Sequence, residues 1–128
     1  MEVPKHVKEL IAGGFSVRYH NINGQEYVEV ENLETGGAPW NRSTVNILVT
    51  IPNNFATGVV ALDAFYADRT LLLGSEKHPR MQSEHTIDSR LWWLISWHYI
   101  KPWQPGKDSL LTHVFHCRQF FKQKGRTN

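Results

Sequence analysis

SRLWWLISWHYIKPWQPG, residues 89–106, is the most informative stretch of this chain. It contains four of the five tryptophans: Trp92, Trp93, Trp97 and Trp103. Each tryptophan side chain buries roughly 150–250 Å², so this stretch must anchor a large part of one core or one interface. A domain of this size cannot easily bury all five tryptophans fully. We therefore expect one or two of them, Trp97 or Trp40, to be partly exposed.

Length and composition are those of one ordinary globular domain. We predict a single domain over residues 1–128, with a flexible tail at 124–128. Fourteen basic and twelve acidic residues leave a net charge of +2, which is too small to predict nucleic-acid binding. The single cysteine, Cys117, excludes an internal disulfide and favours the reducing cytoplasm. The chain begins without an apolar signal region, and no run reaches the roughly 18 apolar residues of a membrane span. We predict no membrane partner.

The N-terminal half shows the pattern of one helix followed by four strands. Residues 4–12 carry apolar side chains at helical spacing, with Pro4 at the first position. Strand patterns follow at residues 15–19, 25–33, 43–51 and 59–66. Asn23-Gly24 predicts a hairpin turn, because both residues tolerate positive φ. The fold class predicted is α+β, with a four-stranded antiparallel meander.

The C-terminal half is expected to contain a long loop and two helices. Residues 69–87 have little periodicity and are predicted to be irregular. Asp88 or Ser89 is the predicted cap of a helical segment that runs to Tyr99. Asp108 is the predicted N-cap of the last helix. The apolar stripe of that helix comprises Leu110, Val114, Cys117 and Phe121, flanked by Leu111, Phe115 and Phe120.

Two short motifs accompany this order of elements. Ile51-Pro52-Asn53-Asn54-Phe55 precedes the strand at 59–66, and Trp103-Gln104-Pro105 precedes the last helix. Order and motifs together resemble the ubiquitin-conjugating (UBC) superfamily. A wider set is similar to a bacterial lineage of UBC-like proteins: Trp92, Ser96, His98, Trp103, Pro105, Gly106 and Asp108. The resemblance implies a UBC-like fold and two partners, a ubiquitin-like protein and a ThiF-type activating enzyme.

One feature departs from the superfamily. A conjugating enzyme carries its modifier on a thiol as a thioester, and the resemblance places that cysteine between the fourth strand and Trp103. Residues 67–101 contain no cysteine, and Cys117 falls on the apolar stripe of the last helix, where a buried thiol is expected. We therefore interpret the chain as a non-catalytic partner that binds the modifier, its activating enzyme or both.

Two alternatives stay open. His78-Pro79 resembles part of the motif that precedes the cysteine in conjugating enzymes, although chance placement in a polar loop is the better explanation of so short a match. If the motif is real, Ser89 would carry the modifier as an oxyester, with His85 or His98 as the general base. The wider segment 83–96 would then hold the nucleophile. The second alternative is a stand-alone binding module with an RWD-like fold.

The remaining polar groups are interpreted as structural. His98 and Asp108 are expected to hydrogen-bond with each other and hold the aromatic segment against the last helix. His113 and Cys117 share a helix face, but a structural zinc site needs about four ligands, so we predict no metal. We predict no cofactor either. The basic residues near the C-terminus are expected to be a solvated helix end.

Overall fold

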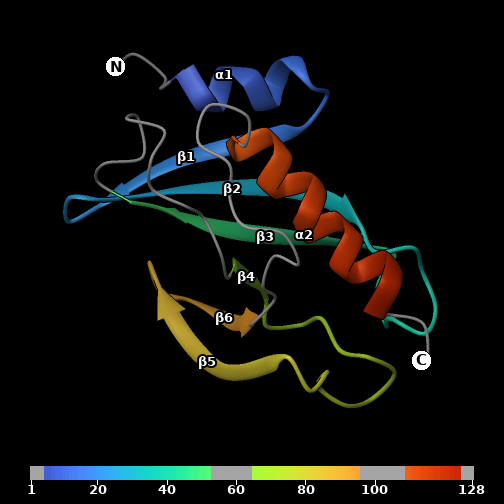
Figure 1. The fold of residues 1–128 in the computed structure, drawn as a ribbon. Coiled ribbons are helices and arrows are strands. Elements are labelled where there is room, and N and C mark those ends of the chain that lie inside the picture. The colour runs from blue at the N-terminus through green and yellow to red at the C-terminus, as the bar shows by residue number, and fades with distance from the viewer. Residues whose placement is uncertain (1–4, 53–64, 96–108, 125–128) are drawn as a thin grey trace.

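The computed structural model describes residues 5–52, 65–95 and 109–124, which form two helices and one antiparallel sheet (Figure 1). The elements are α1 (Lys5–Ala12), β1 (Ser16–Ile22), β2 (Gln25–Glu34), β3 (Thr44–Ile51), β4 (Phe65–Asp68), β5 (Met81–Ile87), β6 (Arg90–Ile95) and α2 (Leu110–Lys124). The sheet has six strands in the order β1-β2-β3-β4-β6-β5. This architecture confirms the predicted α+β class.

The first four strands pair in chain order. The turn between β1 and β2 lies at Asn23-Gly24, where φ is 53° and 88° as a tight two-residue hairpin requires. In β3 the apolar residues Val45, Ile47, Val49 and Ile51 are all buried. The predicted sheet of four strands is nevertheless too small, because β6 and β5 extend it beyond β4.

The structure of residues 81–95 differs from both predictions made for it. Part of the segment predicted to be irregular is strand β5, and the segment predicted to be helical begins with strand β6. Asp88 and Ser89 are not a helix cap: with φ of 52° and 64° they form the turn of the β5–β6 hairpin. Residues 96–99 lie outside the described part of the chain. Strand is the physically favoured state here, because aromatic and branched side chains pack well on both faces of a pleated sheet.

The conformation of Ser89 leads to a stability prediction. A left-handed φ costs a residue with a Cβ roughly 1–2 kcal/mol, whereas glycine adopts it freely. Ser89→Gly is therefore expected to raise the free energy of unfolding by about 1 kcal/mol. Chemical denaturation measures this change. Thr86→Gly, in the neighbouring strand, is the control and should lower stability, because glycine weakens a strand interior. A destabilising Ser89→Gly would contradict the turn.

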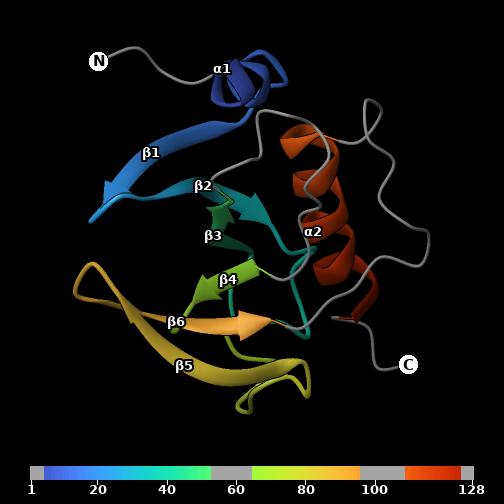
Figure 2. The ribbon, with the colours of Figure 1, turned by 60° about the vertical axis from the view of Figure 1, so that its left-hand side comes forward.

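Helix α2 lies across one face of the sheet, which we call the inner face, and α1 lies beside β1 (Figures 1 and 2). The buried apolar residues of α2 are Leu110, Val114, Cys117, Phe120 and Phe121. Phe65 of β4 contacts Phe120 and Phe121 edge to face, with ring centroids 5.9 and 5.8 Å apart. The predicted apolar stripe is thus confirmed, but Phe115 beside it is 41 % exposed.

The start of α2 is capped by Ser109. The Ser109 hydroxyl accepts from the Thr112 amide at 3.3 Å, and the Thr112 hydroxyl accepts from the Ser109 amide at 2.7 Å. This reciprocal pair satisfies two amides that have no partner within the helix. Asp108, the predicted cap, lies outside the described residues.

The expectation that Trp40 is partly exposed is wrong. Trp40 belongs to the β2–β3 connection; its side chain is 4 % exposed, and its indole nitrogen reaches the backbone of α2. Trp92 and Trp93 are also buried, at 1 % and 5 % exposed. Trp97 and Trp103 fall in segments that the structure does not describe. No described helix has the length and apolar character needed to cross a membrane.

Candidate functional site

Few of the predicted site residues belong to the described part of the chain. Ser96, His98, Trp103, Pro105, Gly106 and Asp108 all lie outside the described residues, so the predicted His98–Asp108 contact remains a prediction. Trp92 is described, and Ser89 lies exposed in the hairpin turn.

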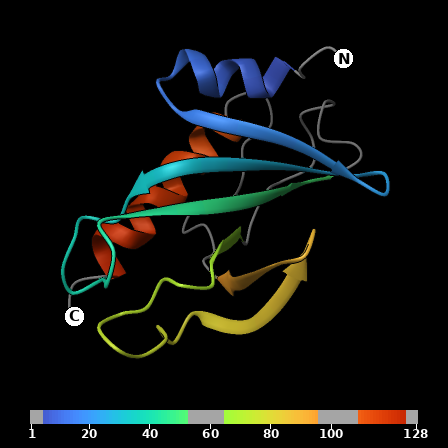
Figure 3. The same cartoon turned by 180° about the vertical axis from the view of Figure 1, so that it is seen from behind.

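The sheet face opposite α2, which we call the outer face, is covered by no described helix (Figure 3). Trp92 of β6 lies on this face and is almost fully buried. The guanidinium of Arg90 lies over its ring, 4.6 Å from the centroid. The Trp92 indole nitrogen has no hydrogen-bond partner among the described residues. The motif tryptophan is thus a sheet residue whose burial depends on a charged neighbour.

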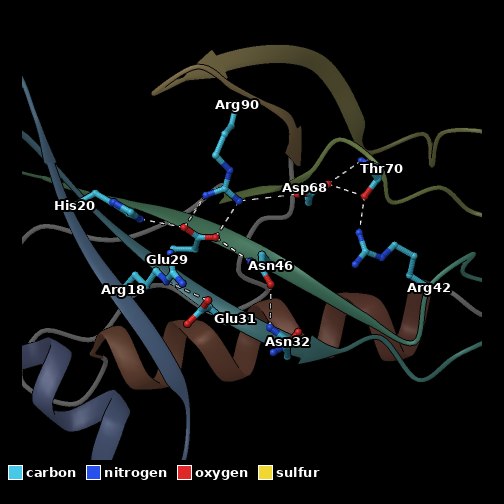
Figure 4. Close-up of polar contacts among 10 residues, drawn as sticks. All are labelled: Arg18, His20, Glu29, Glu31, Asn32, Arg42, Asn46, Asp68, Thr70 and Arg90. Carbon is cyan, nitrogen blue, oxygen red and sulfur yellow. Dashed lines mark hydrogen bonds and ion pairs between the residues drawn. The ribbon is translucent and has the colours of Figure 1, made fainter.

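Glu29 of β2 is the centre of a polar network on the outer face (Figure 4). Its carboxylate accepts two hydrogen bonds from the Arg90 guanidinium, at 2.8 and 2.9 Å. The Nδ2 atom of Asn46 donates at 2.9 Å, and Nε2 of His20 lies 3.0 Å away. Only 2 % of Glu29 is exposed. The alternation of β2 predicts the face on which Glu29 lies, but nothing in the sequence indicates its burial.

The network keeps Glu29 ionised. Burial by itself raises the pKa of the carboxyl, but the hydrogen bonds from Arg90, His20 and Asn46 outweigh it and lower the pKa to about 2. The same contact with Glu29 raises the pKa of Arg90. A carboxylate that is saturated with donors and held ionised is poorly suited to proton transfer near neutral pH. Glu29 therefore acts as a clamp between β2 and the β5–β6 hairpin.

A shallow hollow lies beside this network. It is lined by His20, Ile22, Glu29, Leu48, Ile87, Asp88, Arg90 and Trp92. Its lining thus comes from the β1–β2 hairpin, from β3 and from the β5–β6 hairpin. It combines apolar side chains with the charged residues around Glu29.

Ser83 and His85 of β5 form a second polar contact. The Ser83 hydroxyl lies 2.8 Å from Nε2 of His85. The His85 ring meets the edge of Tyr66 on β4, with centroids 5.4 Å apart and planes at 71°. Sequence reasoning named His85 as a base for Ser89, whereas the hydrogen bond of His85 is to Ser83. The pairing of residues two apart follows only once β5 is recognised as a strand.

Cys117 lies in the core, as predicted. It is fully buried between α2 and the inner face of the sheet, and burial raises the pKa of its thiol well above the ordinary value. Burial, followed by the charge of His116, lowers the pKa of the adjacent His113 to about 3, so His113 is neutral at pH 7. Within the described residues no group of three or more histidine, cysteine, aspartate or glutamate side chains could hold a metal.

His78 lies in the connection between β4 and β5, where its neighbours Lys77, Pro79 and Arg80 are exposed, but its own side chain is buried. It is 7 % exposed and stacks on Trp40 with ring centroids 5.8 Å apart. Its Nδ1 accepts a hydrogen bond from the Arg80 amide at 3.0 Å. The His78 side chain thus anchors this connection to the core ahead of β5, whereas Pro79 is exposed.

Comparison with known proteins agrees with the resemblance seen in the sequence. Residues 5–124 match the family described as "Prokaryotic E2 family E". No curated protein and no solved structure matches the chain. Because the match spans nearly the whole chain, the protein belongs to prokaryotic E2 family E, a bacterial UBC-like family.

Proposed function

We propose that the protein is a component of a bacterial ubiquitin-like modification system that does not carry its modifier on a cysteine. It binds a ubiquitin-like protein, a ThiF-type activating enzyme or both, and in this role it does no thioester chemistry. Membership of the E2 family supports the pathway. The proposal includes a cytoplasmic location, where a free thiol such as Cys117 stays reduced.

The burial of Cys117 is the observation that carries the proposal. A thioester forms when a thiolate reaches the carboxyl terminus of the modifier, so the thiol must be accessible and readily ionised. Cys117 is the only cysteine of the chain, is fully buried against the sheet and has a raised pKa. It fails both requirements, and its role is that of a small apolar side chain in the core.

Affinity capture from the native cells tests this function. Tagged protein is captured from one portion of lysate under native conditions and from another after denaturation, and both are analysed by mass spectrometry. We expect a ubiquitin-like protein and a ThiF-type enzyme in the native capture, and no modifier attached to Cys117 after denaturation. Cys117→Ala should recover the same partners, since the thiol touches neither.

Three outcomes decide against the proposal. A modifier that survives denaturation but is absent from Cys117→Ala would make the protein a cysteine transferase. Recovery of neither partner in either portion would favour the stand-alone binding module. Loss of both partners in a Cys117→Ala variant with native circular dichroism would show that the thiol matters to binding.

A further inference from the structure

Ser83 and His85 combine a hydroxyl and an imidazole in hydrogen-bond contact at an edge of the sheet. β5 pairs only with β6 among the described strands. The two residues lie two apart on β5 and so point to the same face. Ser83 is exposed and His85 half-buried, so the hydroxyl is open to a partner while the imidazole is partly held by the sheet. The Oγ–Nε2 distance of 2.8 Å is within the range expected of a nucleophile and its base.

Two local features orient the pair. The register of β5 against β6 shifts between Met81 and Ser83, which marks a bulge immediately before the serine. Bulges turn a side chain away from the regular pleat and are frequent at sheet edges and near active sites. The edge contact with Tyr66 restrains rotation of the His85 ring. Glu84, between them, lies on the opposite face, where it pairs with Arg69, and so adds no charge beside the hydroxyl.

We propose that Ser83 is a nucleophile that accepts an acyl group from an activated carboxyl terminus, with His85 as its general base. In its reactive tautomer His85 carries its proton on Nδ1, and Nε2 accepts the Ser83 hydroxyl. Ser83 Oγ attacks the carbonyl carbon of a thioester held by a partner enzyme, and a C–O bond forms as the C–S bond breaks. The serine proton passes to Nε2 and then to the departing sulfur, which leaves as a thiol. The product is an oxyester on Ser83.

The geometry favours Ser83 over Ser89 within the segment 83–96. Ser89 occupies the hairpin turn, beyond the last paired residues Ile87 and Arg90, whereas His85 pairs with Trp92 further along the hairpin. The nitrogen that would activate a hydroxyl is already engaged by Ser83. His98, the other predicted base, lies outside the described residues.

The inference rests on the proposed function only for the identity of the acyl donor, a ubiquitin-like protein. The reactivity of Ser83 toward a small electrophile does not depend on that pathway. The test therefore uses the purified full chain and an alkyl fluorophosphonate, which phosphonylates activated serines. We expect labelling at Ser83, mapped by peptide mass spectrometry. Ser83→Ala should abolish this labelling, and His85→Gln should lower its rate about a hundredfold, the low end of what a general base supplies.

Thr86→Ala is the matched control, because Thr86 is an exposed hydroxyl residue on the same strand. Its labelling rate should equal that of the unmodified protein. His85→Gln keeps a hydrogen-bonding group beside Ser83 but removes the proton acceptor, so it separates base catalysis from positioning. Circular dichroism and thermal unfolding establish that each variant is folded.

Labelling on Ser89 or any residue other than Ser83, or equal labelling of His85→Gln and the unmodified protein, would overturn the inference. No labelling above that of Ser83→Ala would also overturn it. If both pathway partners are captured but Ser83 is not labelled, this inference is wrong and the proposed function is unaffected. If Ser83 is labelled but neither partner is captured, the proposed pathway is wrong, whereas the assignment of Ser83 as a nucleophile is still supported.

Discussion

Replacing Glu29 by glutamine is expected to lower the free energy of unfolding by about 3 kcal/mol at pH 7. The carboxylate is almost fully buried and receives two hydrogen bonds from Arg90, with Asn46 and His20 beside it. A neutral glutamine removes the charge that Arg90 requires and turns an NH₂ group toward other donors. Removing one member of a buried ion pair typically costs about 3–5 kcal/mol. Urea denaturation of both proteins measures the loss.

The pH dependence of stability gives an independent measure of the same network. The pKa of Glu29 falls from 4.5 to about 2 on folding, which corresponds to about 3 kcal/mol because each pKa unit is worth about 1.4 kcal/mol. A lowered pKa means that this stabilisation is complete above pH 4.5 and is lost as the pH falls toward 2. The stability difference between the unmodified protein and Glu29→Gln should therefore shrink across that interval.

Glu31→Gln is the matched control for the Glu29 prediction. Glu31 lies on the same strand and the same face, and it pairs with Arg18 at 3.2 Å. The Arg18 side chain is 66 % exposed, so water screens this pair and its loss should cost less than about 1 kcal/mol. Equal effects of Glu29→Gln and Glu31→Gln, or a difference that does not change with pH, would contradict the buried clamp.

The elements that the sequence predicts are those whose signals are local. The turn residues at Asn23-Gly24 and the alternation of β3 each follow from a few neighbouring positions. The apolar stripe of α2 is equally local, and its burial confirms it. For the same reason Cys117 is correctly predicted as a core thiol.

The elements that the sequence does not predict depend on distant parts of the chain. β5 is an edge strand with Ser83, Glu84, His85 and Thr86 in succession, so it shows no apolar alternation. β6 carries apolar residues on both faces and cannot be told from a buried helix by periodicity. Glu29 is buried by Arg90, which is 61 residues away in sequence. The Ser83–His85 contact needs β5 to be extended before the two side chains share a face.

Trp40→Ala is expected to lower the free energy of unfolding by about 3–5 kcal/mol, the range typical of a buried tryptophan. Trp40 is 4 % exposed and packs against His78, Phe120 and Phe121, with ring centroids 5.5–6.1 Å apart. The indole nitrogen donates to the Phe121 carbonyl at 2.9 Å. Phe121 lies in the last turn of α2, where carbonyls have no partner within the helix. Trp40 thus fills space in the core and supplies a hydrogen-bond donor to the C-terminal end of α2.

Trp40→Phe separates these two contributions, because it keeps an aromatic ring but removes the N–H donor. Its cost should be smaller, about 1–3 kcal/mol, and should arise from the buried Phe121 carbonyl left without its donor and from the smaller ring. Phe115→Ala is the control on the same helix: its side chain is 41 % exposed, so its loss should cost less than about 1 kcal/mol. Chemical denaturation orders the three variants. Trp40→Ala should therefore lower the free energy of unfolding more than Phe115→Ala does. Equal losses would contradict the conclusion that Trp40 fixes the β2–β3 connection to α2.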